Sequence, residues 1–408
     1  MTSRPHRTDR SSRQHHVDAT ALRSRTGHFE NARTRRTLGT VSSTQPLRVG
    51  TRGSALATTQ TGHVASRLAE LTGRDIETVR IRTEGDVLTG SLAQMGGTGV
   101  FVTALRSALL DGRCDVAVHS LKDLPTEPAP GLSIVTPERE DPRDALCARD
   151  GLTLARLPRD ARVGTGSPRR AAQLRAVRPD LEVIDIRGNV GTRLARVHGE
   201  EADLDAVVLA HAGLLRLGLE EHVTEALEPT VMAPAAGQGA LAVEVRSSSL
   251  DDAVLAGALA ALDHEPTRLA VLAERALLAR LEAGCAAPVG AHATLDGGVL
   301  TLAAVVARVD GTEQLSHTAR TELPGPSLPD AAAPHTARAR DDAARDLGTR
   351  VADALVADGA SRLAPLRAPD PGAGAATPRP VVEQPTPGPT PESARRALRD
   401  GGYRGEQA

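Results

Sequence analysis

Ionisable side chains gather in the segment AVHSLKDLP, residues 117–125, directly after an apolar stretch that predicts a short strand. Functional residues are common where a buried strand runs out into a loop. Lys122 is the only lysine in the chain, and every other cationic side chain is arginine or histidine. Lysine is a compact charge whose pKa moves readily on burial, whereas arginine is a fixed planar fork. The lone lysine therefore predicts a functional site, with biased codon usage as the plainer alternative.

Asp123, the neighbour of Lys122, is the best candidate for acid–base chemistry. A carboxylate beside a lysine can stay ionised, stabilise a cation or carry a proton. The alternative is a local ion pair that contributes little to stability. His119 allows the same functions, but a packed or capping histidine at a strand end is the commoner case.

Three predicted strand-to-helix turns combine arginine with small or hydroxyl residues. Helix N-termini present free N–H groups, and arginine binds a carboxylate through two parallel hydrogen bonds. Capping and solvated arginines explain any single turn, whereas three turns on successive α/β units predict a site for a ligand with several carboxylates. No GxxxxGKS/T or GxGxxG loop follows a strand, which favours such a ligand over a nucleotide. The turns are TRGS (51–54), TGSPRR (165–170) and RGNVGTR (187–193).

Composition and charge exclude several classes of function. The net charge is -2, so no global basic field attracts nucleic acid or a membrane surface. Aromatic residues make up 1% of the chain, with no tryptophan, which leaves few platforms for stacking bases. No stretch reaches the ~18 consecutive apolar residues of a membrane helix, and the N-terminal segment lacks the apolar core of a secretory signal. We therefore expect no nucleic-acid partner and no membrane.

The three cysteines, Cys114, Cys147 and Cys285, are far apart and form no CxxC pair. Their odd number and spacing argue against a disulfide framework and a metal site, and they fit a reducing cytoplasm. Cys285 lies in the segment EAGCAAPVG after a predicted long helix. A buried structural thiol is the commonest fate of a cysteine, but Gly284 and Pro288 predict an exposed loop, where a thiol can carry a covalent group.

The chain is too long for one ordinary domain, and its patterns predict three folded regions. Strand and helix patterns alternate in the first two regions, which indicates two α/β domains. A long amphipathic helix, a hairpin around the sequence DGG and a closing helix predict a small α+β third domain. The two ends of the chain have compositions that predict disordered tails. The expected boundaries are 1–45 (tail), 46–140, 144–233, 262–366 and 368–408 (tail).

Most individual elements are also predicted from these patterns. The expected strands are 47–51, 77–83, 114–118, 161–165, 181–186, 204–210, one ending at 245, and the hairpin strands 289–295 and 299–308. The expected helices are 55–71, 100–110, 171–177, 190–197, 267–283 and 341–359. A Gly-rich loop is expected over 85–99.

Taken together, these segments resemble the porphobilinogen deaminase family, also called the hydroxymethylbilane synthases, over residues 47–366. Nine motifs occur in the family's order, which makes chance agreement implausible. They are TRGSALA, GVFVTALRSALL, DVAVHSLKDLPT, EREDPRDAL, VGTGSPRRAAQL, IRGNVGTRL, VLAHAGLLRLGL, APAAGQGA and LEAGCAAPVG. The resemblance implies three domains, the first two like those of periplasmic binding proteins around a central cleft, and the third a small α+β domain with the cofactor cysteine. It also implies that residues 234–257 rejoin domain 1 and that the protein is a monomer.

The resemblance assigns expected roles to individual residues. Cys285 matches the cysteine that holds a dipyrromethane cofactor through a thioether. Asp123 matches the catalytic aspartate, which stabilises positive charge on pyrrole nitrogens, and Lys122 matches a lysine in the same cleft. Gln60 and Gln238 fall at further cleft positions. The residues that match groups holding acetate and propionate side chains are Arg52, Ser54, Thr165, Ser167, Arg169, Arg170, Arg187, Arg193 and Arg216.

The implied function is that of a transferase in tetrapyrrole and haem biosynthesis. Such an enzyme condenses four porphobilinogen molecules head to tail, releases ammonia and yields the linear tetrapyrrole hydroxymethylbilane. The residues suit that chemistry, because a carboxylate in a partly desolvated site lowers the energy of the cation left when the amine departs. Two alternatives are a binding protein for a small carboxylate and an inactive relative. The turn around Cys285 argues against the first, and the joint presence of Lys122, Asp123 and Cys285 argues against the second.

The sequence departs from the family's common pattern at several positions. Gly166 stands where a hydroxyl residue is frequent, which removes one expected hydrogen bond to a ligand. Gln94 and Thr98 replace common lysines, and Glu84 replaces a common arginine, so no binding role is expected for that loop. Leu215 is also often basic in relatives.

Overall fold

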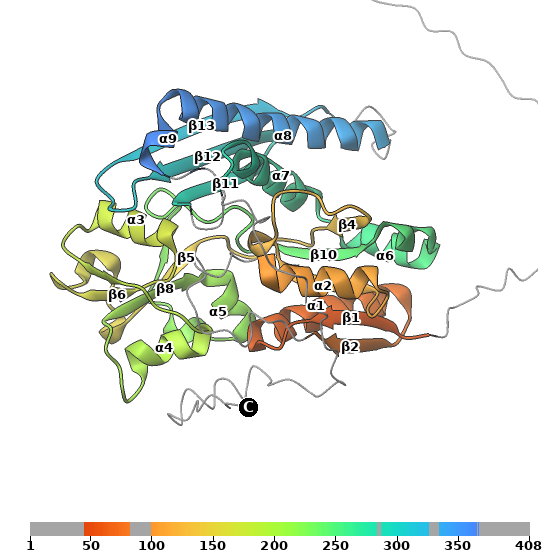
Figure 1. The fold of residues 1–408 in the computed structure, drawn as a ribbon, viewed down its shortest axis with the longest axis horizontal. Helices are drawn as coiled ribbons and strands as arrows, with labels where there is room; N and C mark the ends of the chain where they lie inside the picture. Colours follow the sequence, from red (N-terminus) through yellow and green to blue (C-terminus); the bar gives the residue numbers. More distant parts are fainter. Residues whose placement is uncertain (1–44, 82–98, 284–286, 326–333, 365, 367–408) are drawn as a thin grey trace, which may run out of the picture. The chain divides into compact units, whose positions relative to one another are not determined.

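The structure, a computed structural model, describes residues 45–81, 99–283, 287–325, 334–364 and 366. These residues form two five-stranded mixed sheets and one three-stranded antiparallel sheet, each with helices packed on it (Figure 1). The predicted α/β class with a smaller α+β part near the C-terminal end is confirmed. The predicted tails lie outside the described residues, apart from residue 45. No helix in the described ranges is both long and apolar enough to cross a membrane.

The first sheet has the strand order β2-β1-β3-β10-β4. β1 pairs in parallel with β2 and β3, whereas β10 runs antiparallel to both β3 and β4. The sequences of β3 (VAVHS) and β10 (LAVEVR) are mainly apolar, as the burial of central strands requires. The elements are β1 (Leu47–Thr51), α1 (Ala55–Thr72), β2 (Ile76–Arg80), α2 (Gly99–Leu110), β3 (Val116–Ser120), β4 (Leu132–Val135), β10 (Leu241–Arg246) and α6 (Ala253–Leu262).

The second sheet repeats this plan with the order β7-β6-β8-β5-β9. β6 is parallel to β7 and β8, and β5 is antiparallel to β8 and β9. All five residues of β5 are buried, which follows from its central place in the sheet. The elements are β5 (Asp144–Ala148), β6 (Arg162–Gly164), α3 (Pro168–Val177), β7 (Glu182–Ile184), α4 (Val190–His198), β8 (Ala206–Ala210), α5 (His211–Leu217) and β9 (Glu225–Leu227).

The chain crosses between these sheets twice, from β4 to β5 and from β9 back to β10. The two crossing segments touch, because the Glu140 N–H donates to the Gly239 carbonyl (3.3 Å) and Arg139 Nε donates to the Gln238 carbonyl (2.7 Å). Gly239 has a φ of +88°, and a Cβ atom there would lie 2.4 Å from the Glu140 carbonyl oxygen. Only glycine therefore permits this close approach.

The third sheet is an antiparallel β11-β12-β13 meander with α7 and α8 packed on it. Its core is aliphatic, with residues such as Leu277, Leu302 and Leu347 fully buried. The predicted hairpin is present, and Gly297 and Gly298 form its turn with positive φ angles. The elements are α7 (Glu265–Arg280), β11 (Val289–Asp296), β12 (Val299–Ala307), β13 (Gln314–Glu322), α8 (Pro334–Ala357) and α9 (Ala360–Leu363).

Several elements were not predicted from the sequence. β13 (QLSHTARTE) is polar along most of its length and leaves every second residue exposed, so no apolar alternation marks it. β5 (DALCA) is too short, and too evenly buried, for a periodic signal. The sequence also left β4, β9, α5 and α6 unassigned.

Candidate functional site

The backbone after β3 presents the segment around the lone lysine as a single 3-10 turn, Leu121–Asp123. Leu121 is buried, and its N–H donates to the Ala240 carbonyl (3.0 Å), which ties the turn to the start of β10. Lys122 and Asp123 are half-buried. Among the described residues, the Asp123 carboxylate has no hydrogen bond or ion pair with another side chain.

Lys122 is held by one neutral partner. Its Nζ donates to Gln238 Oε1 (3.2 Å), on the crossing segment between β9 and β10. Burial, and to a smaller extent the nearby Arg170 guanidinium, lower the pKa of Lys122 to about 8, while Asp123 and Asp144 act in the opposite direction. At neutral pH Lys122 is thus a cation that loses its proton more easily than an exposed lysine.

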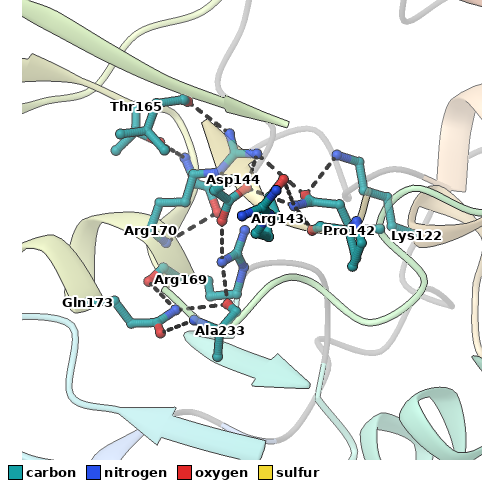
Figure 2. A network of polar contacts seen from close by, with 12 residues as sticks. Lys122, Pro142, Arg143, Asp144, Thr165, Arg169, Arg170, Gln173 and Ala233 are labelled. Atoms are coloured by element: carbon teal, nitrogen blue, oxygen red, sulfur yellow. Dashed lines mark hydrogen bonds and ion pairs between the residues drawn. The ribbon is translucent and has the colours of Figure 1, made fainter. Parts of the chain in front are cut away.

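A buried ion cluster forms the opposite side of this site (Figure 2). Asp144, at the start of β5, is 0% exposed and lies between two arginines of α3. Arg169 Nη1 contacts Asp144 Oδ2 (2.8 Å), and Arg170 Nη2 contacts Asp144 Oδ1 (2.8 Å). Burial alone would raise the pKa of Asp144, but the two guanidinium groups hold it well below its usual range.

Arg169 and Arg170, expected to hold ligand carboxylates, are thus engaged inside the protein. Besides Asp144, Arg169 donates to the Ala233 carbonyl (2.5 Å) and Arg170 to the Val208 carbonyl (3.0 Å). Two cations share one carboxylate, so the cluster keeps a net positive charge. Sequence reasoning missed Asp144, although the motif EREDPRDAL contains it.

Two of the three hydroxyl residues that were expected to bind ligand carboxylates, Ser54 and Ser167, cap helices. Ser54 Oγ accepts from the Ala57 N–H (3.3 Å) at the start of α1, and Ser167 Oγ accepts from the Arg170 N–H (3.5 Å) at the start of α3. Thr165 Oγ1 accepts from the Ser167 N–H (3.2 Å). These bonds fit the capping alternative for each turn taken singly.

The other expected arginines differ in their surroundings. Arg187 is exposed and pairs with Asp185 (3.1 Å), whereas Arg216 is buried and donates to the Gly239 carbonyl (2.6 Å). Arg193 is half-buried, and its Nε is buried without a hydrogen-bond partner among the described residues. Burial, together with the positive charges of Arg170 and Arg187, lowers the pKa of Arg193 to about 10. An anionic ligand would relieve this excess of positive charge.

The last two expected positions, Arg52 and Gln60, lie in the first of the three turns and in the helix that follows it. Arg52 is half-buried directly after β1, and Gln60 is buried in α1. Gln60 Oε1 accepts from Ser120 Oγ (3.2 Å), which connects α1 to the last residue of β3.

Gly166 is small for a steric reason. A Cβ atom at this position would lie 2.4 Å from the Ile186 carbonyl oxygen. A hydroxyl side chain therefore does not fit this backbone without a shift.

Two neighbouring residues of α7 hold the loops that carry the site. Glu274 is 0% exposed and accepts from both Arg139 Nη1 (2.7 Å) and Arg139 Nη2 (3.1 Å), as well as from the Gly237 N–H (2.6 Å). Arg275 donates to the Leu124 carbonyl (3.0 Å), just after the Lys122 turn. The third sheet's helix therefore fixes both the Gln238 turn and the Lys122 turn.

Cys285, the expected attachment point of the cofactor, lies outside the described residues. Glu84, Gln94 and Thr98, in the loop for which no binding role is expected, lie outside them as well. The other two cysteines are described: Cys114 and Cys147 are fully buried, and burial raises their thiol pKa values to about 11 and about 12. No cluster of residues that could hold a metal ion occurs in the described ranges.

The fold and the site define an α/β protein with a cationic site where two mixed sheets meet. A family model described as "Porphobilinogen deaminase, dipyromethane cofactor binding domain" matches residues 47–254. A second, described as "Porphobilinogen deaminase, C-terminal domain", matches residues 268–357.

Curated relatives agree with the family models. The porphobilinogen deaminase of Leifsonia xyli subsp. xyli is 56% identical over 325 residues, covering 79% of this chain and 95% of the relative. That of Micrococcus luteus is 53% identical over 373 residues, covering 82% and 98%. The chain belongs to the porphobilinogen deaminase family. Its activity is porphobilinogen deaminase activity, the synthesis of hydroxymethylbilane in tetrapyrrole biosynthesis, and the recognition made from the nine motifs is confirmed.

Solved structures with low sequence identity were also found. A YaeC-family lipoprotein from Enterococcus faecalis is 16% identical with a TM-score of 0.31, covering 55% of this chain and 93% of that chain. A periplasmic substrate-binding protein of an ABC transporter from Coxiella burnetii is 14% identical with a TM-score of 0.34, covering 53% and 91%.

Proposed function

We propose that Asp123 is the catalytic carboxylate of this porphobilinogen deaminase. The observation that carries the proposal is its lack of a side-chain partner in the described part of the chain, next to Lys122 and within a cationic site. A carboxylate that is not engaged by another side chain of the described ranges stabilises the positive charge that develops on a pyrrole when its amine leaves. It also accepts and returns the proton that must move as ammonia departs.

Lys122 and the arginines hold the carboxylates of porphobilinogen and of the growing chain. Arg193 and Arg187 are the best candidates for this role. Together with Arg170 they place three positive charges near one another, and Asp185 supplies a single negative charge. Arg52, Arg169, Arg170 and Arg216 contribute charge, with Ser54, Thr165 and Ser167 placed at the same turns.

Arg169 and Arg170 act at longer range than expected from the sequence, because Asp144 accepts hydrogen bonds from both of them. They shape the field of the site and anchor α3 against β5. Arg193 is a stronger candidate than either of these two arginines for direct contact with a ligand carboxylate.

The dipyrromethane cofactor of the family fits this donor set. Arg193 Nε is buried without a hydrogen-bond partner among the described residues, and a carboxylate of the cofactor would supply the missing acceptor. When bound, the cofactor supplies the pyrrole carbon that begins chain growth. The residues of this chain bind and orient it and balance its charge.

We assign the attachment point to Cys285. The other two thiols are fully buried, and burial raises their pKa values, so neither is a reactive thiolate. Cys285 follows α7, whose Glu274 and Arg275 reach the Gln238 and Lys122 turns, and this brings the third domain close to the site.

Intact mass spectrometry of the purified protein tests this assignment. The wild-type protein and Cys147→Ala should both carry the added mass of the dipyrromethane, and Cys285→Ala should lack it. An adduct that persists in Cys285→Ala, or that is lost in Cys147→Ala, would contradict the assignment.

Domain boundaries of 46–140 plus 234–257, 144–233 and 262–366 are supported by the strand order, since β10 lies in the first sheet. We propose further that the protein is a monomer of the cytoplasm, as is usual in the family. Sedimentation equilibrium of the purified holoenzyme checks the first point, and fractionation of cells checks the second.

A further inference from the structure

Gln238 is where the polar networks of the two large sheets meet. Its side chain is fully buried on the crossing segment that leads from β9 to β10. Gln238 Nε2 donates to Asp144 Oδ1 (2.8 Å) and to the carbonyl oxygens of Pro142 (2.8 Å) and Arg143 (3.3 Å). The amide nitrogen is therefore fixed against the segment that opens the second sheet.

The amide oxygen of Gln238 faces two cations. Gln238 Oε1 accepts from Lys122 Nζ (3.2 Å), which follows β3 in the first sheet, and from Arg170 Nη2 (3.4 Å) on α3. The reverse orientation would place the amide oxygen against three acceptor oxygens and the NH₂ group against two cations. The oxygen must therefore point towards Lys122, and a neutral dipole connects Lys122 to the buried ion cluster.

We infer that Gln238 is a positioning residue for Lys122, holding its ammonium group at the junction of the two sheets through an uncharged acceptor. Lys122 is thereby oriented without being neutralised, and its charge stays available to a carboxylate of the substrate. The inference rests on the proposed function, in which Lys122 belongs to the substrate site.

The charges around Lys122 explain why an uncharged acceptor is needed. Asp123 lies on the same 3-10 turn, Asp144 on β5, and Arg169 and Arg170 on α3. Asp144 is already shared between the two arginines, so it neutralises Lys122 only weakly. A carboxylate in place of the amide would form a full ion pair with Lys122. An apolar side chain would leave the ammonium without an acceptor, which lowers the pKa of Lys122 further.

The chain offers an unusually direct test, because Lys122 is its only lysine. Holoenzyme grown with lysine labelled with ¹³C at Cε should give a single lysine side-chain NMR signal, and a pH titration of that signal reports the Lys122 pKa. In Gln238→Met we expect this pKa to fall by about one unit, since one charge-assisted hydrogen bond is lost. In Gln238→Glu we expect the added negative charge to raise it by about as much. The second carboxylate oxygen of this variant would face the Asp144 carboxylate and the Pro142 carbonyl oxygen, so its melting temperature should also fall.

Gln173 provides a matched control. It is also a buried glutamine, and it exchanges hydrogen bonds with the backbone of Ala233 (2.8 and 3.1 Å), on the segment that leads to Gln238. Within the described ranges, the Lys122 ammonium bonds to Gln238 and not to Gln173. Gln173→Met should lower the melting temperature and leave the Lys122 pKa at the wild-type value.

Turnover supplies a second readout. A carboxylate binds Lys122 only while the ammonium is protonated, so the basic limb of the pH profile of kcat/KM should move down in Gln238→Met and up in Gln238→Glu. An unchanged Lys122 pKa in both Gln238 variants, or the same shift in Gln173→Met, would overturn the inference. A shifted pKa with an unmoved basic limb would support the Gln238–Lys122 link and remove Lys122 from the substrate site, which is a failure of the proposed function alone.

Discussion

Asp144 and Asp123 should respond in opposite ways to the same substitution. Asp144 is 0% exposed and bonded to Arg169, Arg170 and Gln238, whereas Asp123 is half-buried and has no side-chain partner among the described residues. Aspartate to asparagine preserves shape and removes the charge. At position 144 this leaves two buried guanidinium groups without a counter-charge, and at position 123 it removes the proposed catalytic carboxylate.

The expected cost of Asp144→Asn is about 3–5 kcal/mol, the usual effect of removing one partner from a buried ion pair. The amide NH₂ group that this substitution introduces would also face donors rather than acceptors. Unfolding slopes grow with the surface exposed, so at roughly 3 kcal/mol per molar urea the midpoint should fall by on the order of 1 M. Asp123→Asn should unfold within ~0.5 kcal/mol of the wild-type protein and lose on the order of 10²–10⁴-fold in turnover.

Far-UV circular dichroism is the suitable probe of unfolding, because the chain contains no tryptophan and only one tyrosine. Turnover is followed by the release of ammonia from porphobilinogen. If Asp144→Asn unfolds at the same urea concentration as the wild-type protein, the buried cluster does not hold β5 to α3 as we argue. If Asp123→Asn retains substantial turnover, Asp123 is not the catalytic carboxylate.

Three further predictions follow from single contacts. Glu274→Gln should destabilise the protein by about 3–5 kcal/mol, because Arg139 loses its buried counter-charge; a melting temperature equal to that of the wild-type protein would contradict this. Burial opposes ionisation of Asp141, but hydrogen bonds from Arg143 and His211 lower its pKa to about 2. The stability it contributes is therefore complete above pH ~4 and is lost as the pH falls towards 2. Asp141→Asn should flatten that part of the stability–pH curve by on the order of 1 kcal/mol, since solvent screens part of the interaction. Lys122→Arg should lower kcat/KM on the order of 10²-fold, because a forked guanidinium displaces the reacting groups; steady-state kinetics with wild-type values would show that a compact ammonium is not required.

Local patterns predicted a large part of the fold correctly. The helix expected at 55–71 is α1 (Ala55–Thr72), and the hairpin around DGG is β11 and β12. Such elements are readable because their apolar residues recur at the helical or strand period. β13 could not be predicted, because its polar sequence has no apolar alternation and it is held as a strand by its pairing with β12.

The sequence by itself determined the family, the lone lysine and its acidic neighbour, and the arginine-bearing turns, because each depends on the types and order of residues along one stretch. Only the tertiary structure decided which charges balance one another. Asp144 meets Arg169 and Arg170 across 25 and 26 positions, and Gln238 meets Lys122 across 116. The Gln238–Lys122 contact arises because the chain crosses twice between two sheets, and the Asp144 contacts arise because the second sheet brings the start of β5 to the start of α3. No local pattern encodes the partner of a side chain that tertiary packing brings near.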